Sequence, residues 1–221
     1  MGIERIDDLT VVIQAGGESK RMGSNKSVMP FLGAPLIMRG VRRLFPICTE
    51  MVITSNEPDR LSFLEPYLDT GRMRIVADRT DRRGALIGML TAFDSSTMPY
   101  VAMVACDMVF PSAPLIAHLR ERLEQSGADV AIPRTSHGYE PFHAVYRRKT
   151  CLDLVEAALE AGEIKATSWL KDAQVIEVGE DEIIAANPRG AAFVNVNTPE
   201  DLHALEQRIL NGELKSLDED D

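Results

Sequence analysis

The sequence predicts a three-layer α/β protein in which helices cover both faces of a doubly wound, mostly parallel sheet. Two observations favour this class. Short apolar runs rich in β-branched residues alternate along the chain with segments of helical periodicity. Several of these runs end abruptly in glycine, asparagine or aspartate, as strands do where a parallel sheet binds its ligands.

The alternation is regular in the first half of the chain. Residues 9–13 are apolar and β-branched, which favours a central strand, and residues 100–105 form the most apolar run. Pro35 is well placed near the start of a helix. We expect strands at 9–13, 51–54, 73–76 and 100–105, with helices at 35–45, 58–68 and 84–93 between them.

The second half is less regular. Alternation of polar and apolar residues favours a strand at 140–146. Thr198 begins the last helix, because it is a capping residue followed by proline and two acidic residues. The other expected elements are strands at 129–132, 175–178 and 192–196, and helices at 114–124, 149–161 and 166–171.

The bulk composition is that of an ordinary globular domain. The 221 residues carry a net charge of −10, which argues against a nucleic-acid-binding protein with a broad basic surface. No apolar run approaches the ~18 residues of a membrane span, and the three cysteines form no paired motif. We therefore expect a cytoplasmic protein with one domain over residues 1–212 and a disordered acidic tail over residues 213–221.

Residues 11–26 carry most of the functional information, because an apolar run there ends in a glycine-rich, basic loop. Gly16 and Gly17 let backbone N–H groups approach a polyanion, while Arg21 and Lys26 supply charges that suit phosphate oxygens. The spacing fits neither the Walker A loop nor the dinucleotide fingerprint. Glycine-rich turns are also frequent in α/β proteins without a phosphate role, so this segment alone leaves both interpretations open.

A third pattern does fit the loop. It resembles the signature of the molybdenum cofactor guanylyltransferases, which is L-A-G-G-x-S-x-R-M-G-x-x-K followed by G-x-P-L. Gln14 stands where that family has leucine. The resemblance implies a Rossmann-like nucleotidyltransferase fold, binding of a nucleoside triphosphate, and attack at its α-phosphorus with release of pyrophosphate. The matching residues are Ala15-Gly16-Gly17, Ser19, Arg21-Met22-Gly23, Lys26 and Gly33-Ala34-Pro35-Leu36.

Asp107 is the expected metal ligand. It follows a strand that is almost wholly apolar, so its carboxylate should lie at the carboxyl edge of the sheet. Nucleotidyl transfer needs a hard oxygen ligand to hold Mg²⁺ against the phosphates, and the resemblance gives that role to the aspartate of a Cys-Asp pair. The family usually has proline two residues later, whereas here it is delayed to Pro111. A turn or cap aspartate is the alternative interpretation.

Asp78, Gly84 and Asn56 are the candidates for binding the nucleoside. Asp78 precedes a segment starting at Gly84 that resembles the family's D-x(5–8)-G-P-L-A-G motif, although its proline is replaced by Ala85. An aspartate can accept hydrogen bonds from the N1–H and amino groups of guanine. Asn56 follows another expected strand. Both polar residues are also common in solvated turns.

Residues 193–202 resemble the closing motif of the same family. Asn195 and Asn197 share a face if this segment is a strand, and they could complete the metal shell or orient the acceptor phosphate. His143 is expected to be packed or hydrogen-bonded, because a phosphate nucleophile is already an anion and does not obviously need a general base.

Taken together, the resemblance implies transfer of GMP from GTP to the terminal phosphate of molybdopterin or its molybdenum form. Arg21, Lys26 and Asp107 are then the catalytic residues and Mg²⁺ the cofactor; other proteins of cofactor biosynthesis, or molybdoenzymes, are candidate partners. One alternative is a cytidylyl- or sugar-phosphate nucleotidyltransferase, because Gln14 lies where the base is read. Another is a regulatory nucleotide-binding domain without turnover. A dehydrogenase is disfavoured by the missing fingerprint.

Overall fold

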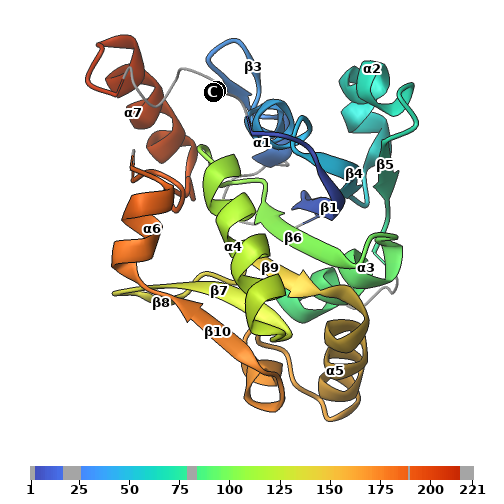
Figure 1. The fold of residues 1–221 in the computed structure, drawn as a ribbon. Helices are drawn as coiled ribbons and strands as arrows, with labels where there is room; N and C mark the ends of the chain where they lie inside the picture. The colour runs from blue at the N-terminus through green and yellow to red at the C-terminus, as the bar shows by residue number, and fades with distance from the viewer. Residues whose placement is uncertain (1–2, 17–25, 79–83, 189, 215–221) are drawn as a thin grey trace.

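The computed structural model describes residues 3–16, 26–78, 84–188 and 190–214. These residues build an eight-stranded mixed sheet with helices on both faces (Figure 1). The strand order is β10-β7-β9-β6-β1-β4-β5, and the short β8 pairs with β7. The predicted three-layer α/β class is confirmed.

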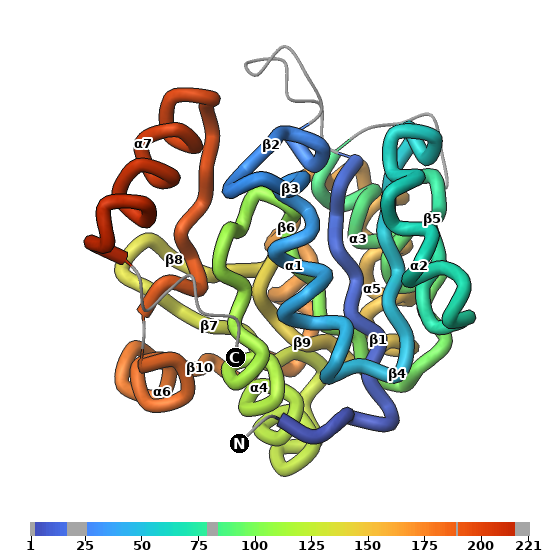
Figure 2. The backbone as a smooth tube through the Cα atoms, turned by 90° about the horizontal axis from the view of Figure 1, so that it is seen from above, coloured from blue at the N-terminus to red at the C-terminus, as the bar shows by residue number. Residues whose placement is uncertain are grey.

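The strands on the N-terminal side of the sheet are parallel, whereas β9 is antiparallel to both of its neighbours, β6 and β7. A separate two-stranded hairpin, β2–β3, lies between α7 and the end of β1 (Figure 2). The bounds are β1 (Ile6–Gln14), β2 (Pro30–Phe31), β3 (Ala34–Pro35), β4 (Cys48–Thr54), β5 (Met73–Val76), β6 (Tyr100–Ala105), β7 (Val130–Thr135), β8 (Gly138–Tyr139), β9 (His143–Arg147) and β10 (Val175–Val178).

The helices follow the expected order with two additions, the short η1 and α6, which the sequence did not reveal. No helix among the described residues has the length and apolarity that crossing a bilayer requires. The bounds are η1 (Lys26–Val28), α1 (Ile37–Leu44), η2 (Pro58–Leu64), α2 (Glu65–Leu68), α3 (Ala85–Ser95), α4 (Ala113–Ser126), α5 (Arg148–Glu160), η3 (Ser168–Asp172), α6 (Glu180–Ala186) and α7 (Pro199–Leu210).

Three expectations about local structure were wrong. Pro35 lies in β3 and not in the first helix, which begins two residues later. The expected strand at 140–146 begins only at His143, because the N–H of Glu140 turns back to the carbonyl of Pro133. The expected strand at 192–196 is replaced by an isolated antiparallel bridge between Met108 and Asn195.

Alternation along the central strand divides the core into two faces. Val11 and Ile13 of β1 pack into the cluster that includes the apolar faces of α1 and α4. Val12 packs on the opposite side, with α3 and α5. This period of two in β1 is what places one helix layer on each face of the sheet.

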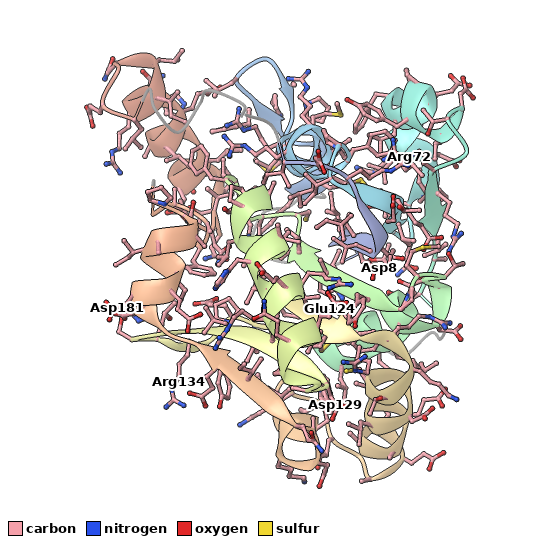
Figure 3. The ribbon with its side chains drawn as sticks, in the orientation of Figure 1. Asp8, Arg72, Glu124, Asp129, Arg134 and Asp181 are labelled. Atoms are coloured by element: carbon pink, nitrogen blue, oxygen red, sulfur yellow. The ribbon has the colours of Figure 1, made fainter. Side chains whose placement is uncertain are left out.

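The layer in front of the sheet is fixed to β1 by Arg120 of α4. Its Nε donates to Asp8 Oδ1 at 3.0 Å, and the same guanidinium pairs with Glu124 one turn along the helix (Figure 3). The guanidinium carbon lies 4.3 Å from the centre of the Tyr100 ring. This arginine is largely buried, and its charge is compensated by the carboxylates of Asp8 and Glu124.

Glu50 joins the four parallel strands that end at the candidate site. Its carboxylate accepts a hydrogen bond from Thr10 of β1 at 2.6 Å, pairs with Arg74 of β5 at 2.8 Å, and accepts from the backbone N–H of Thr97, just before β6, at 2.8 Å. The residue is 8% exposed. A single buried carboxylate therefore links β1, β4, β5 and the segment that enters β6.

We predict that Glu50→Ala lowers the free energy of unfolding by about 2–3 kcal/mol, because it leaves buried donors without an acceptor. Asp153→Ala, at an exposed position of α5, is the control and should change it by less than about 0.5 kcal/mol. Urea unfolding monitored by circular dichroism measures both values. Equal effects of the two substitutions would contradict the role given to Glu50.

Candidate active site

Four of the residues singled out from the sequence follow strands whose ends are in register. Gln14, the last residue of β1, pairs with Thr54 on one side and with Ala105 on the other. Thr54 in turn pairs with Val76. Gly16, Asn56, Asp78 and Asp107 each come two residues after one of these aligned ends. The sheet therefore brings them to one edge, as expected for a parallel α/β fold.

Lys26 and Asp107 are in direct contact. The Nζ of Lys26 donates to Asp107 Oδ2 at 3.1 Å, to the carbonyl of Val196 at 3.1 Å and to Asn197 Oδ1 at 3.4 Å. The lysine side chain is 14% exposed and the aspartate side chain 25% exposed. Asp107 and Val196 follow Lys26 by 81 and 170 positions in the sequence, yet both contact its ammonium group.

The segment that carries both asparagines is bound to the loop after β6 by its backbone. Val109 donates to the carbonyl of Val194 at 3.2 Å, and Val196 donates to the carbonyl of Asp107 at 3.2 Å. Val196 is buried, whereas Asn195 and Asn197 on either side of it are exposed. Both asparagines are therefore exposed beside a buried valine, in a segment that is not a strand.

The cap of α7 fixes the same segment from the other side. The Thr198 hydroxyl accepts from the N–H of Asp201 at 3.0 Å, and the Asp201 carboxylate accepts from the N–H groups of Asn197 at 3.1 Å and Thr198 at 2.9 Å. These bonds lower the pKa of the Asp201 carboxyl below its usual value. The predicted threonine cap is confirmed as a complete capping box.

The oxygen donors at this end of the site fit a hard divalent cation. Asp107 supplies a carboxylate, and Asn195 and Asn197 supply exposed amide groups nearby. Among the described residues no cluster of three or more histidine, cysteine or acidic side chains forms a protein-only metal cage. A single carboxylate with open coordination positions is the arrangement that Mg²⁺ uses when substrate phosphates supply the remaining ligands.

Asn56 and Asp78 form a reciprocal pair at the other end of the edge. The Asn56 amide nitrogen donates to Asp78 Oδ2 at 2.7 Å, and the Asp78 N–H donates to Asn56 Oδ1 at 2.9 Å. Gly16 lies next to them, since a Cβ built on it would be 3.6 Å from Asp78 Oδ2. Gly84 caps the start of α3 with φ of 143°, a conformation that favours glycine.

Gln14 packs against Gly88 in the first turns of α3. A Cβ added to Gly88 would lie 3.2 Å from both the amide nitrogen and the amide oxygen of Gln14. The amide nitrogen is buried and has no hydrogen-bond partner among the described residues. The side chain that departs from the family signature is thus held by close packing, beside the Gly84–Gly88 segment expected to contact the nucleoside.

Two reactive residues near the edge are excluded from acid–base or nucleophilic roles. His143 is fully buried, accepts from the N–H of Ser112 at 3.0 Å, and burial lowers its pKa to about 4. Burial, together with the charge of Asp107, raises the pKa of the Cys106 thiol to about 12. The expectation of a packed histidine is confirmed.

Other expected residues are not placed by this structure, and some contacts were not expected. Gly17 and Arg21 lie outside the described residues. The Val196 carbonyl was missed because a backbone acceptor has no sequence signature. Glu140, in the turn Gly138-Tyr139-Glu140-Pro141 before β9, was not among the expected site residues.

Comparison with known proteins identifies the family. A model of the MobA-like NTP transferase domain matches residues 11–178. The chain belongs to the MobA-like NTP transferase family. It is 32% identical to the molybdenum cofactor guanylyltransferase of Desulfosudis oleivorans, over 95% of this chain and 100% of that protein. It is 35% identical to that of Burkholderia ambifaria, over 90% of this chain and 96% of that protein.

Solved structures show the same fold. Molybdopterin-guanine dinucleotide biosynthesis protein A from Archaeoglobus fulgidus matches with a TM-score of 0.77 at 23% identity, covering 91% of this chain and 99% of that one. A 4-diphosphocytidyl-2C-methyl-D-erythritol synthase from Anaerococcus prevotii matches with a TM-score of 0.67 at 14% identity, over 91% and 96% of the two chains. The MobA-like fold is thus shared with a protein named for a cytidyl product.

We predict that Gly88→Ala and Gln14→Ala are energetically coupled. In the wild-type background the new methyl group meets the Gln14 amide, and we expect about 1 kcal/mol of destabilisation. In the Gln14→Ala background that contact is absent, and alanine should stabilise α3 by about 0.5–1 kcal/mol, as it does in helix interiors. Urea unfolding of the wild type, the two single variants and the double variant completes this double-mutant cycle. Additive changes in the free energy of unfolding would contradict the contact between Gly88 and Gln14.

Proposed function

We propose that the protein transfers GMP from GTP to the terminal phosphate of molybdopterin or its molybdenum form and releases pyrophosphate. The contact between Lys26 and Asp107, at the edge where four strand ends align, carries this proposal. A cation and a carboxylate held together at that point can serve a triphosphate and its metal ion. The guanylyltransferases among the relatives support the choice of reaction.

We infer where each substrate group would lie from the strand ends that carry the candidate residues. Asn56 and Asp78 follow β4 and β5, so the base and ribose would lie at that end. At the end of β1, the backbone N–H of Gly16 would face the phosphates, whereas that of Ala15 already donates to the carbonyl of Thr54 at 2.9 Å. Asp107 and Lys26 follow next, beside β6, and would flank the α-phosphate.

Mg²⁺ is the metal ion that we propose for this site. Asp107 would hold it, with Asn195 or Asn197 close enough to contribute through an amide oxygen or a bound water. When bound, such an ion neutralises charge that develops on the phosphoryl oxygens and on the departing pyrophosphate.

The protein's own contribution is positioning and electrostatics. A phosphate nucleophile is already anionic, and the buried, neutral His143 supports a reaction without a general base. Lys26 donates to Asp107, Val196 and Asn197, which holds its ammonium group at the site. Bound phosphate would become a further acceptor, so little reorganisation is needed.

Guanine is the base that the Asp78 end favours. A carboxylate is an acceptor, and guanine offers two adjacent donors, N1–H and the 2-amino group, whereas cytosine offers a single amino group beside an acceptor nitrogen. The Asn56 amide fixes Asp78 Oδ2 for this purpose. A cytidylyltransferase remains the second candidate, because Gln14 replaces the usual leucine beside Gly88.

We place this reaction in the cytoplasm. The three cysteines, Cys48, Cys106 and Cys151, are free thiols, which is the ordinary state in a reducing compartment. Protein partners from cofactor biosynthesis or among the molybdoenzymes stay a prediction, as do the single domain over residues 1–212 and the acidic tail.

We predict that Lys26→Ala and Asp107→Ala each lower turnover at least ~100-fold, the scale on which a preorganised transition-state contact is lost. Lys171→Ala and Asp172→Ala remove the same kinds of charge from exposed positions of η3 and should stay near the wild-type rate. Pyrophosphate release with GTP and molybdopterin is the measurement. Near-wild-type turnover of either site variant would overturn this mechanism.

We further expect turnover to stop when EDTA removes divalent metal and to return with Mg²⁺. With Mg²⁺ restored, GTP, CTP, ATP and UTP are compared at equal concentrations, and GTP should be used at least ~10-fold better than the others, the discrimination of one or more hydrogen bonds. Preference for CTP would establish the cytidylyl alternative. Nucleotide binding without any product would establish the non-catalytic one.

A further inference from the structure

The acceptor must reach Asp107 from the part of the edge that the nucleotide leaves free. Under the proposed function, the nucleoside would lie over β4 and β5 and the phosphates over β1, and these strands are all on one side of β6. Strands β9 and β7 continue the sheet on the other side. In-line attack at the α-phosphorus requires the nucleophile to be opposite the leaving pyrophosphate. The heterocycle attached to the attacking phosphate would then lie over β9, β7 and β8.

Glu140 lies at that part of the edge, across from Asp107. The N–H of Ala105, the last residue of β6, donates to the carbonyl of Phe142 at 3.3 Å. Asp107 is two residues beyond Ala105, and Glu140 is two residues before Phe142. Because neighbouring strands are about 5 Å apart, the chain segments that carry Asp107 and Glu140 lie side by side at the same edge of the sheet.

The backbone around Glu140 is fixed, but its carboxylate lacks a cation. The N–H of Glu140 donates to Pro133 at 3.0 Å, and its carbonyl accepts from His143 at 3.1 Å. Its Oε1 accepts from the Thr135 hydroxyl at 3.2 Å, and no described lysine or arginine pairs with it. The residue is half-buried, and this burial raises the pKa of its carboxyl above the usual value, against small opposing effects of Thr135 and His137.

Glu177, on strand β10 next to β7, is a carboxylate whose hydrogen bonds and charge are satisfied, in contrast to Glu140. It is paired with Arg134 at 3.0 Å, and the Tyr139 hydroxyl also donates to it. Arg134 lies at the outer edge of the sheet beside β10 (Figure 3). Glu177 is therefore satisfied within the protein, whereas the desolvated Glu140 has accepting capacity left.

We propose that Glu140, supported by Thr135, binds the 2-amino-4-oxopyrimidine edge of the acceptor's pterin ring. This assignment rests on the proposed function. A ring N–H and an adjacent amino group present two parallel donors, which match the two oxygens of one carboxylate. The same donor pair occurs in guanine, which the proposed function gives to Asp78. Each heterocycle thus has a carboxylate of its own, one on each side of Lys26 and Asp107.

The test uses Glu140→Gln, which keeps the size of the side chain and removes one acceptor oxygen. With GTP saturating, we expect the KM for molybdopterin to rise about 10- to 100-fold, the range for hydrogen bonds to a charged group. The KM for GTP should stay within about twofold. Glu177→Gln is the matched control and should leave both constants unchanged.

A binding measurement separates recognition of the ring from a structural role. The probes are 6-hydroxymethylpterin phosphate and the lumazine analogue, in which an oxo group replaces the 2-amino group, each used as a competitive inhibitor against molybdopterin. The wild-type protein should prefer the pterin at least ~10-fold, and Glu140→Gln, whose amide can donate to the oxo group, should lose or reverse that preference.

Each outcome decides something. A wild-type protein that makes no guanylylated product overturns the proposed function and this assignment with it. A wild-type protein that makes the product, while Glu140→Gln keeps its KM and its pterin preference, overturns the assignment alone. A rise in the Mg²⁺ requirement of Glu140→Gln, with the pterin preference intact, would make Glu140 a metal ligand and also overturn it.

Discussion

The shared register of four parallel strand ends is the constraint on which the rest of the site depends. Gln14, Thr54, Val76 and Ala105 are paired side by side, so any residue placed two positions beyond one of them lies next to its counterparts. A slip of one residue in any pairing would turn side chains to the opposite face. The buried Glu50 links the same strands nearer their other end, so its hydrogen bonds use none of the polar groups of the site.

Lys26 converts this edge into a charged centre by joining segments that are distant in sequence. It contacts Asp107 after β6 and Val196 before α7, and those two segments are already bound to each other by backbone hydrogen bonds. The capping box of α7 holds Asn197 in turn. A partly buried ammonium group is unfavourable unless it is paired, and these acceptors compensate its loss of hydration.

Local chemistry explains what the sequence could and could not predict. Strands β5, β6 and β10 have the predicted bounds, because an apolar β-branched run bounded by turn residues is a local signal. The antiparallel β9 could not be predicted in this way, since alternation reveals a strand but not its partner or direction. Residues 192–196 also alternate, yet they bridge a loop instead of a sheet. Asp107 was recognisable after its strand, whereas Glu140 acquires meaning only once β9 folds back beside β6.

The antiparallel strand also has a consequence for specificity. Because β9 runs against β6, its entry turn lies at the edge where the parallel strands end, and it brings Glu140 to the side of Asp107 opposite Asp78. Guanine and pterin share one donor edge, so two carboxylates of similar chemistry could accept either ring. In the arrangement that we propose, the phosphate chain distinguishes them, because the triphosphate is bound at the end of β1 with its base toward β4 and β5. Under the proposed function, the direction of the phosphates therefore assigns each ring to its carboxylate. A protein of net charge −10 would then bind the phosphates of two anionic substrates around Lys26.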